Sequence, residues 1–418
     1  MSDFANSQNA EPGVRIVHGA SLSQPNALPT ALPLFVGFTQ KGAGDVYALS
    51  SFNEFVDKFG NEYESDNTLF SLYDPMKHYF KVGGERCYVL SLGGFESYID
   101  PINSFWTFLQ SVPWPQVWAQ APQCTLLAVP DLSLLPAHEI LIWRDAISLL
   151  LSLSVRDDHV FVVLDGPDDP IRLSRILRDV VLRSPAEDRS HGALYWPPLI
   201  TYSAYQANPT NPKSIPCSSA VIAMMQKTDR ERGVWKAPAN EELPEVLRPM
   251  HPMMPPLESP SASLNRIRSL QRRGVRVWGD QTLLSTDEPA SNPWRYVQVR
   301  RTASYVQASL REVVRFALFE PNNELTWLRL QGVIRVWLRK LWKVGGLAGA
   351  VEADAFSIKI GVGESMTRAD LDEGLLIIQI NLAFYAPAEF IELQLQLHTG
   401  EAQILSRLST PNRSEVVS

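Results

Sequence analysis

The regular alternation of two kinds of segment between residues 125 and 200 constrains the fold most. Nearly continuous apolar runs alternate there with amphipathic stretches, at residues 125–132, 136–153, 159–167, 169–184 and 192–200. Apolar runs without internal alternation indicate strands that are buried on both faces, and helical connections between them favour parallel pairing. The sequence therefore predicts an α/β domain around a parallel sheet, with further strands at residues 34–38 and 86–94.

The C-terminal part of the chain has a different pattern. A strand at residues 294–301 is predicted to lead into a helix at 302–319, and a second helix covers about 324–343. Three strands follow, at residues 355–363, 375–385 and 388–398. The last one alternates apolar and polar residues, which is typical of a half-buried strand at a sheet face. These segments predict a separate α+β domain.

The chain length of 418 residues allows two or three domains. Residues 1–30 are polar and proline-rich and predict an extended N-terminal arm, and the α/β domain then covers residues 31–286. The α+β domain covers residues 287–397, and the polar residues 398–418 form a C-terminal tail.

Composition excludes several classes of function. The net charge of -7 argues against nucleic acid as a partner. The three cysteines and seven histidines form no cluster with metal-ligand spacing, and no phosphate loop or dinucleotide motif occurs, so we expect no metal and no cofactor. Residues 1–13 lack the features of a signal peptide, and the longest apolar stretch, residues 146–155, is too short to span a bilayer.

One acidic cluster leaves an α/β hydrolase-like enzyme as a remote alternative. Asp165, Asp168 and Asp169 follow a predicted strand, which is where α/β enzymes carry catalytic carboxylates. Aspartate, glycine and proline also form turns and helix N-caps, and this structural interpretation is favoured. No serine nucleophile motif occurs, so we expect no catalytic residues.

A basic helix is the most informative local feature. At about 100° per residue, five cations of the second C-terminal helix fall within an arc of roughly 140°. They are Arg329, Arg335, Arg339, Lys340 and Lys343. Apolar residues fill the opposite side, so the sequence predicts one buried face and one nearly pure basic face. Like charges four residues apart repel, which favours an acidic partner, with a membrane surface as the weaker alternative.

Several motifs occur in an order that resembles the tail sheath proteins of contractile phages and injection particles. They are "GVWKAPAN", "IRSLQRRGVRVWGDQTL", "WRYVQVRR", "FEPNNELTW", "LWKVGGLAGAVEADAFSIKIG" and "APAEFIELQLQL". The resemblance extends over nearly the whole chain, from residue 12 to about 397. Its signature positions are Gly233, Trp235, Lys236, Pro238, Asn240, Trp278, Arg300, Glu320 and Pro321.

The resemblance implies a structural protein and not an enzyme. It implies a subtilisin-like, three-layer α/β domain without protease activity, an innermost C-terminal domain, and extended terminal arms. Subunits would assemble in the bacterial cytoplasm as six-fold rings around an inner tube. Contraction would then drive the tube of a released particle or virion into a target cell. The partners implied are other sheath subunits, the tube protein and baseplate proteins, without membrane insertion by this chain.

The resemblance also implies roles for particular residues. The basic helix would face acidic groups on the tube. Arms lent to a neighbouring subunit would exchange strands through residues with apolar side chains, for which the candidates are Val14, Ile16, Ile391, Leu393, Leu395 and Leu397. Trp235 is expected to pack parts of the α/β domain together.

The chain departs from the family pattern in three places. "LQRRG" replaces the usual loop before Trp278, a proline-rich insert covers residues 243–260, and about 20 residues follow Leu397. These departures leave open a minor sheath paralogue, or a non-contracting adaptor layer, at the baseplate or collar.

Overall fold

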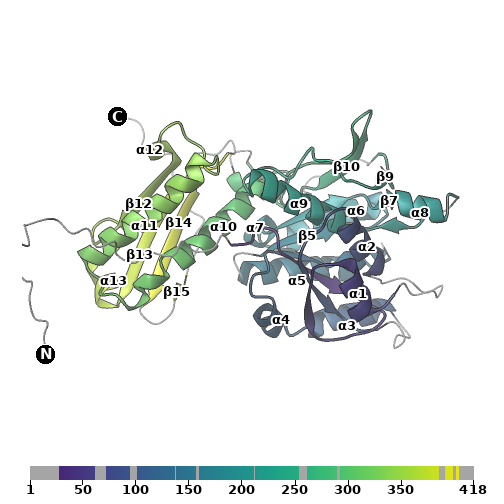
Figure 1. Cartoon of the computed structure of the whole chain (residues 1–418), viewed down its shortest axis with the longest axis horizontal. Helices are drawn as coiled ribbons and strands as arrows, with labels where there is room; N and C mark the ends of the chain where they lie inside the picture. The colour runs from purple at the N-terminus through teal and green to yellow at the C-terminus, as the bar shows by residue number, and fades with distance from the viewer. Residues whose placement is uncertain are drawn as a thin grey trace, which may run out of the picture.

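The computed structural model describes residues 28–61, 72–94, 101–136, 138–156, 160–210, 212–253, 261–289, 292–385, 391–398 and 402–403. Figure 1 shows two bodies, a larger one that contains β1 to β11 and a smaller one formed by α10 to β15. We call them the larger and the smaller domain. Helix α10 (Val297–Val313) runs from the contact between them into the smaller domain.

In the described part of the chain, the larger domain is built on an eight-stranded sheet with the order β11-β10-β6-β5-β4-β1-β3-β2. The strands are β1 Pro33–Gly37, β2 Val46–Leu49, β3 Cys87–Ser91, β4 Leu126–Ala128, β5 Phe161–Asp165, β6 Gly192–Trp196, β10 Asn265–Leu270 and β11 Gly274–Trp278. All neighbours from β10 to β3 pair in parallel, and only β11 and β2 at the two edges are antiparallel. The predicted parallel α/β sheet is therefore confirmed.

Helices cover both faces of this sheet and make three layers. One apolar core lies under α3 (Pro101–Ser111), α4 (Trp114–Gln120), α5 (Ile140–Arg156) and α6 (Pro170–Arg183). The other lies under α1 (Phe52–Phe59), α2 (Tyr73–Lys81) and α9 (Ser218–Arg232). Neighbouring strand residues such as Leu34 and Phe35 belong to opposite cores, as the alternation of side chains along a strand requires. The three-layer prediction is confirmed, while the subtilisin-like layout stays a prediction.

The run at residues 192–200 was predicted as one strand, and this is wrong. Strand β6 ends at Trp196, and β7 (Leu199–Thr201) belongs to a separate small sheet with β8 (Ser214–Ile215) and β9 (Val246–Pro249). Pro197 and Pro198 have no N–H group with which to continue a ladder, so the chain leaves the large sheet there. Helix α7 (Ala186–Ser190) precedes β6, and α8 (Tyr202–Ala207) follows β7.

The smaller domain packs helices against one antiparallel sheet. In the described residues its strand order is β12 (Phe356–Ile360), β13 (Leu375–Leu382), β14 (Ile391–His398) and β15 (Ala402–Gln403). Helix α11 (Glu324–Lys343) lies across this sheet in Figure 1, and α12 (Glu352–Ala355) and α13 (Arg368–Asp372) are short connections. The predicted second helix and three strands are confirmed.

The prediction of a strand at residues 294–301 is wrong. A 3-10 turn (Pro293–Arg295) precedes α10, which begins at Val297. The first eight residues of α10 are all buried, because this end lies between the two domains. Burial on every side removes the amphipathic pattern of a surface helix, and the alternating valines then resemble a strand in sequence.

Strand β14, which carries four of the candidates for strand exchange, has a neighbouring strand on both sides over part of its length. It pairs with β13 along its length, and β15 pairs with it at Gln396 and Leu397. The chain therefore folds back to cover this end of the strand. Val14 and Ile16, and most of the predicted tail, lie outside the described residues.

Candidate functional site

Helix α11 presents one face to the core of the smaller domain. The Asn323 side chain accepts a hydrogen bond from the Thr326 N–H group and caps the first turn. Leu330, Ile334 and Leu338, at intervals of four residues, are fully buried against the sheet. This spacing keeps them on one side of the helix, so the opposite side is free to meet solvent or a partner.

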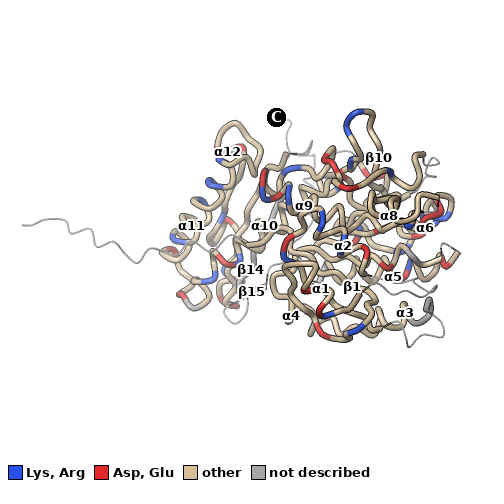
Figure 2. The backbone as a smooth tube through the Cα atoms, turned by 45° about the vertical axis from the view of Figure 1, so that its right-hand side comes forward, with Lys and Arg blue, Asp and Glu red and all other residues tan. Residues whose placement is uncertain are grey.

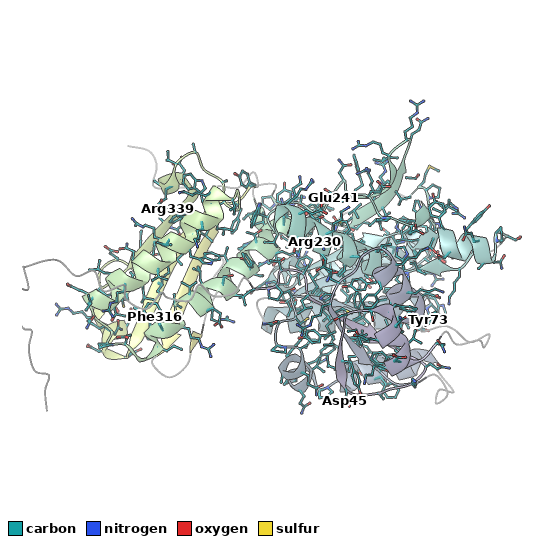
Figure 3. All side chains as sticks on the ribbon, in the orientation of Figure 1. Asp45, Tyr73, Arg230, Glu241, Phe316 and Arg339 are labelled. Atoms are coloured by element: carbon teal, nitrogen blue, oxygen red, sulfur yellow. The ribbon has the colours of Figure 1, made fainter. Side chains whose placement is uncertain are left out.

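The five predicted cations lie on the outer side of α11. Arg329, Arg335, Lys340 and Lys343 are exposed, and Arg339 is half-buried. Figure 2 shows this row of basic residues along the helix, and Figure 3 labels Arg339 toward its C-terminal end. The sequence-based grouping of these residues on one helix face agrees with their positions.

The outer face of α11 also carries exposed aliphatic side chains, so the prediction of a nearly pure basic face is wrong. Leu325 is 61% exposed, Leu328 is 66% exposed and Val336 is 56% exposed. At about 100° per residue they fall between the cations on the helical wheel. The sequence interpretation considered only the apolar residues that fill the inner face. We call the five cations and these three aliphatic residues the α11 outer face.

An acid of the same chain already neutralises part of this face. The Arg339 guanidinium donates to both carboxylate oxygens of Glu352, at 2.5 Å from Nε and 3.1 Å from Nη2. These hydrogen bonds, and the charges of Arg335 and Lys343, hold the pKa of Glu352 below its usual range. Sequence reasoning missed Glu352, because it lies in the next helix and only the turn at residues 344–351 brings it back.

The signature loop at residues 233–240 belongs to the larger domain and contacts the smaller domain through Trp235. Gly233 ends α9 with φ 89°, a conformation that favours glycine, and Asn240 donates its N–H to the Val277 carbonyl at 2.7 Å. The Trp235 ring packs against the core of the smaller domain, while Lys236 is exposed and Pro238 is buried. Trp235 therefore has a packing role, as predicted, but its ring packs against the core of the smaller domain and not between parts of the α/β domain.

The remaining signature residues are dispersed. Arg300 is buried in α10, stacks on the Trp294 ring at 3.9 Å and donates to Ser190 Oγ at 2.7 Å. Trp278 is exposed on β11, and Glu320 and Pro321 are exposed in the turn before α11. The structure does not bring these residues into one site.

The three aspartates of the acidic cluster make three separate structural contacts. Buried Asp165 accepts hydrogen bonds from the Ser218 N–H (2.8 Å) and the Cys217 thiol (3.2 Å) at the start of α9. Asp169 caps α6, and Asp168 contacts His251 Nε2 at 2.7 Å. The predicted turn and N-cap role is thus observed directly for Asp169.

The chemistry available around this cluster is limited. Burial raises the pKa of Asp165 to about 6 and raises the pKa of the Cys217 thiol well above its ordinary value. A thiol held in its neutral form is a poor nucleophile. A cavity of about 420 Å³ lies nearby, with Asp168, Asp169 and His251 in its wall. Within the described ranges, no three acidic, histidine or cysteine side chains gather in a way that could hold a metal ion.

Among the helices that the structure describes, none is long and apolar enough to cross a membrane.

Comparisons with known proteins identify the family. The family described as phage tail sheath C-terminal domain matches residues 290–398. A chain from the structure of the anti-feeding prophage (AFP) baseplate in the contracted state is 31% identical, with a TM-score of 0.77 over 97% of this chain and 100% of that chain. The chain belongs to the family of contractile tail sheath proteins.

Other sheath proteins agree with this assignment. A chain of the PVC sheath complex in the contracted state, from an extracellular contractile injection system, is 27% identical (TM-score 0.65, 92% of this chain and 97% of that chain). The sheath tail protein of Listeria innocua is 10% identical (TM-score 0.58, 90% and 97%) and shares the fold alone. No curated protein sequence matches the chain. The family match from 290 to 398 begins just before α10 and ends with β14, so it contains the α11 outer face.

Proposed function

We propose that this sheath protein is a structural subunit of a contractile injection particle. Its subunits stack as six-fold rings around an inner tube, and contraction of the rings drives the tube into a target cell. A chain of the AFP helical sheath in the contracted state supports this, because it is 29% identical over 92% of this chain. Movement of this kind requires two packings of the same subunits and no catalytic residue. The structural contacts of Asp165, Asp168 and Asp169 support a role without catalysis.

The α11 outer face is the surface that we propose for the inner tube. Its composition carries the argument, because exposed cations are interleaved with exposed leucine and valine side chains. Leu325 and Leu328 are three residues apart and adjacent on the helix surface, Val336 lies about two turns further along the same face, and exposed aliphatic groups on one face favour a surface that a partner covers. The cations select an acidic partner and the aliphatic groups add contact area, so the tube surface that fits is acidic with apolar gaps.

This proposal predicts how the interaction responds to salt. The Debye length shortens to roughly 8 Å at physiological ionic strength and to about 3 Å at 1 M, so exposed charge pairs weaken as salt is added. Aliphatic contacts do not weaken in this way. We therefore expect tube binding to fall with salt and to retain a residual, salt-independent part.

The test is co-assembly of the purified chain with the tube protein of its own gene cluster, from low salt to 1 M NaCl. The triple variant R329Q/R335Q/K343Q should lose the salt-dependent part of binding. The control R175Q/R183Q removes two exposed arginines from α6 and should bind as the parent does. Equal binding by the triple variant and the control would remove α11 from the interface.

A second candidate concerns the position of the subunit in the particle. The AFP baseplate chain has a higher TM-score (0.77) than the AFP helical sheath chain (0.66). A chain of the 6-fold symmetrised AFP baseplate also has a TM-score of 0.66, so the single match at 0.77 is what motivates a specialised sheath layer next to the baseplate as the alternative to a subunit repeated along the tail. Antibody-gold labelling of native particles separates the two, because label at one end indicates a terminal layer and label along the tail a main sheath subunit.

A further inference from the structure

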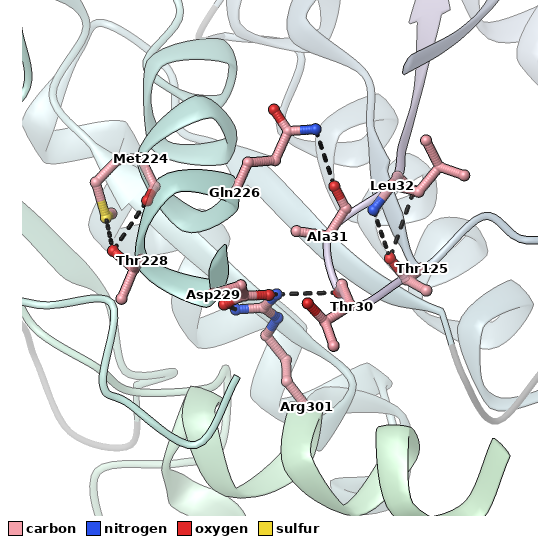
Figure 4. A network of polar contacts seen from close by, with 9 residues as sticks. All are labelled: Thr30, Ala31, Leu32, Thr125, Met224, Gln226, Thr228, Asp229 and Arg301. Atoms are coloured by element: carbon pink, nitrogen blue, oxygen red, sulfur yellow. Dashed lines mark hydrogen bonds and ion pairs between the residues drawn. The ribbon is translucent and has the colours of Figure 1, made fainter. Parts of the chain in front are cut away.

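Thr30, Ala31 and Leu32, the three residues before β1, each form a backbone hydrogen bond with a side chain from another part of the chain. The Thr30 carbonyl accepts from Arg301 Nη2 of α10 at 3.1 Å, and the Ala31 carbonyl accepts from Gln226 Nε2 of α9 at 2.9 Å. The Leu32 N–H donates to Thr125 Oγ1 at 2.8 Å. Figure 4 shows these contacts together, around the point where the described chain enters the large sheet.

The two donors are themselves fixed. Arg301 makes a bidentate pair with Asp229, at 3.2 Å from Nη1 to Oδ1 and 2.6 Å from Nη2 to Oδ2, and only 2% and 4% of the two side chains are exposed. Gln226 Oε1 accepts from the Tyr79 hydroxyl at 2.7 Å. Gln226 and Asp229 are three residues apart on α9, so they lie on one side of that helix.

Apolar packing contributes little to fixing residues 28–30. Residues 28–30 are only partly buried, and together with Arg301, Tyr305 and Arg311 they line a cavity of about 170 Å³. The polar contacts are therefore the main constraint on the chain before Ala31.

A buried ion pair is a poor way to gain stability, because desolvation of both charges offsets their attraction. A bidentate ion pair does fix the orientation of the guanidinium group, and therefore the direction of its remaining N–H donors. Here the remaining contact goes to the backbone of the N-terminal arm. The Arg301 side chain comes from the first turns of α10, the helix that continues into the smaller domain.

We propose that Arg301, Asp229 and Gln226 are positioning residues that form a clamp on the root of the N-terminal arm and tie it to α10. The arm root is thereby fixed where α9 of the larger domain meets the start of α10, and it keeps this position at the junction of the two domains when the sheath changes its packing. This inference rests on the proposed function, together with the expectation from the family resemblance that the arm reaches a neighbouring subunit. The clamp fixes the position of Thr30, from which the arm leaves the larger domain.

Two variants test the clamp. R301K keeps a charge for Asp229, but a single ammonium group cannot replace the planar fork that serves Asp229 and Thr30 together. The double variant D229L/R301M removes both charges, so neither is left buried alone. The control R311K changes an arginine that lines the same cavity and is not among the clamp residues. Circular dichroism confirms that each variant is folded.

The first readout is amide hydrogen exchange at Leu32 in the purified chain, because its N–H donates to Thr125 Oγ1, whereas Thr30 and Ala31 take part through their carbonyl groups. We expect exchange at least tenfold faster in R301K and in D229L/R301M, and unchanged exchange in R311K. Exchange within twofold of the parent in both variants would overturn the clamp.

The second readout is the assembly and contraction of particles that carry each variant. We expect fewer or incomplete rings with both clamp variants and normal particles with R311K. Faster exchange combined with normal assembly and contraction would refute the tie between arm and α10. If the parent chain itself is never found on particles, the proposed function fails, and the exchange result still decides whether the clamp exists.

Discussion

The Asp229–Arg301 pair predicts a large energetic coupling between two buried charges. Removing one partner leaves the other charged group in a site where its side chain is almost completely buried. Such a change typically costs about 3–5 kcal/mol, whereas apolar replacement of both partners is often close to neutral. We therefore expect D229L alone and R301M alone each to destabilise the larger domain by about 3–5 kcal/mol. The double variant should lie within about 1 kcal/mol of the parent, which is the cost of leaving the Thr30 carbonyl without its donor.

The assay is urea unfolding of the purified chain, followed by tryptophan fluorescence. In thermal unfolding of the same chain, the single variants should also lower the Tm by roughly 10 °C for a domain of this size. The control is K81M, which breaks the Lys81–Glu245 ion pair at the surface (2.7 Å) and should leave the unfolding midpoint unchanged. If the effects of the two single variants add up in the double variant, the pair is not coupled and the reasoning about the clamp is wrong.

Further predictions concern the core, the signature loop and the acidic cluster. L338A should destabilise the smaller domain by about 2–5 kcal/mol in denaturant unfolding, while L328A, at an exposed position of the same helix, should change stability by less than about 0.5 kcal/mol. G233A should destabilise by more than about 1 kcal/mol, because φ is 89° and the new Cβ would lie 2.3 Å from the following tryptophan ring. G332A, with open space at its Cβ, should instead stabilise α11, and equal effects of the two glycine variants on the urea midpoint would contradict this. Burial raises the pKa of Asp165 from 3.8 to about 6, so the protonated carboxyl stabilises the folded chain below pH 4, and this stabilisation is lost as the pH rises to 6. The urea midpoint of the parent should therefore fall between pH 4 and 6, and the urea midpoint of D165N should fall less over the same range.

The sequence predicts the parallel sheet and α11 because each has a local physical signal. Residues 125–200 contain apolar runs that only a doubly covered sheet can bury. Helix α11 has an asparagine N-cap and leucine and isoleucine side chains at helical spacing. In these elements the local preference and the tertiary environment agree.

The errors occur where tertiary contacts decide the outcome. The start of α10 is buried on all sides between two domains, so its sequence has no amphipathic period. The partner of Arg339 comes from a separate helix, and a helical wheel of α11 cannot include it. The clamp on Thr30 joins residues up to 271 positions apart, and its acceptors are backbone atoms that have no sequence signature.

The Glu352 contact has a consequence for the detachment of the subunit from a partner. A carboxylate on the tube that binds Arg339 would compete with Glu352, so one ion pair is exchanged for another and the net gain is small. When the two surfaces separate, the arginine returns to Glu352 and does not have to be rehydrated alone. In the proposed contact with the tube, Arg339 would therefore form and break its ion pair easily, while Arg329, Arg335, Lys340 and Lys343, for which the described residues show no ion pair, would make the contact selective.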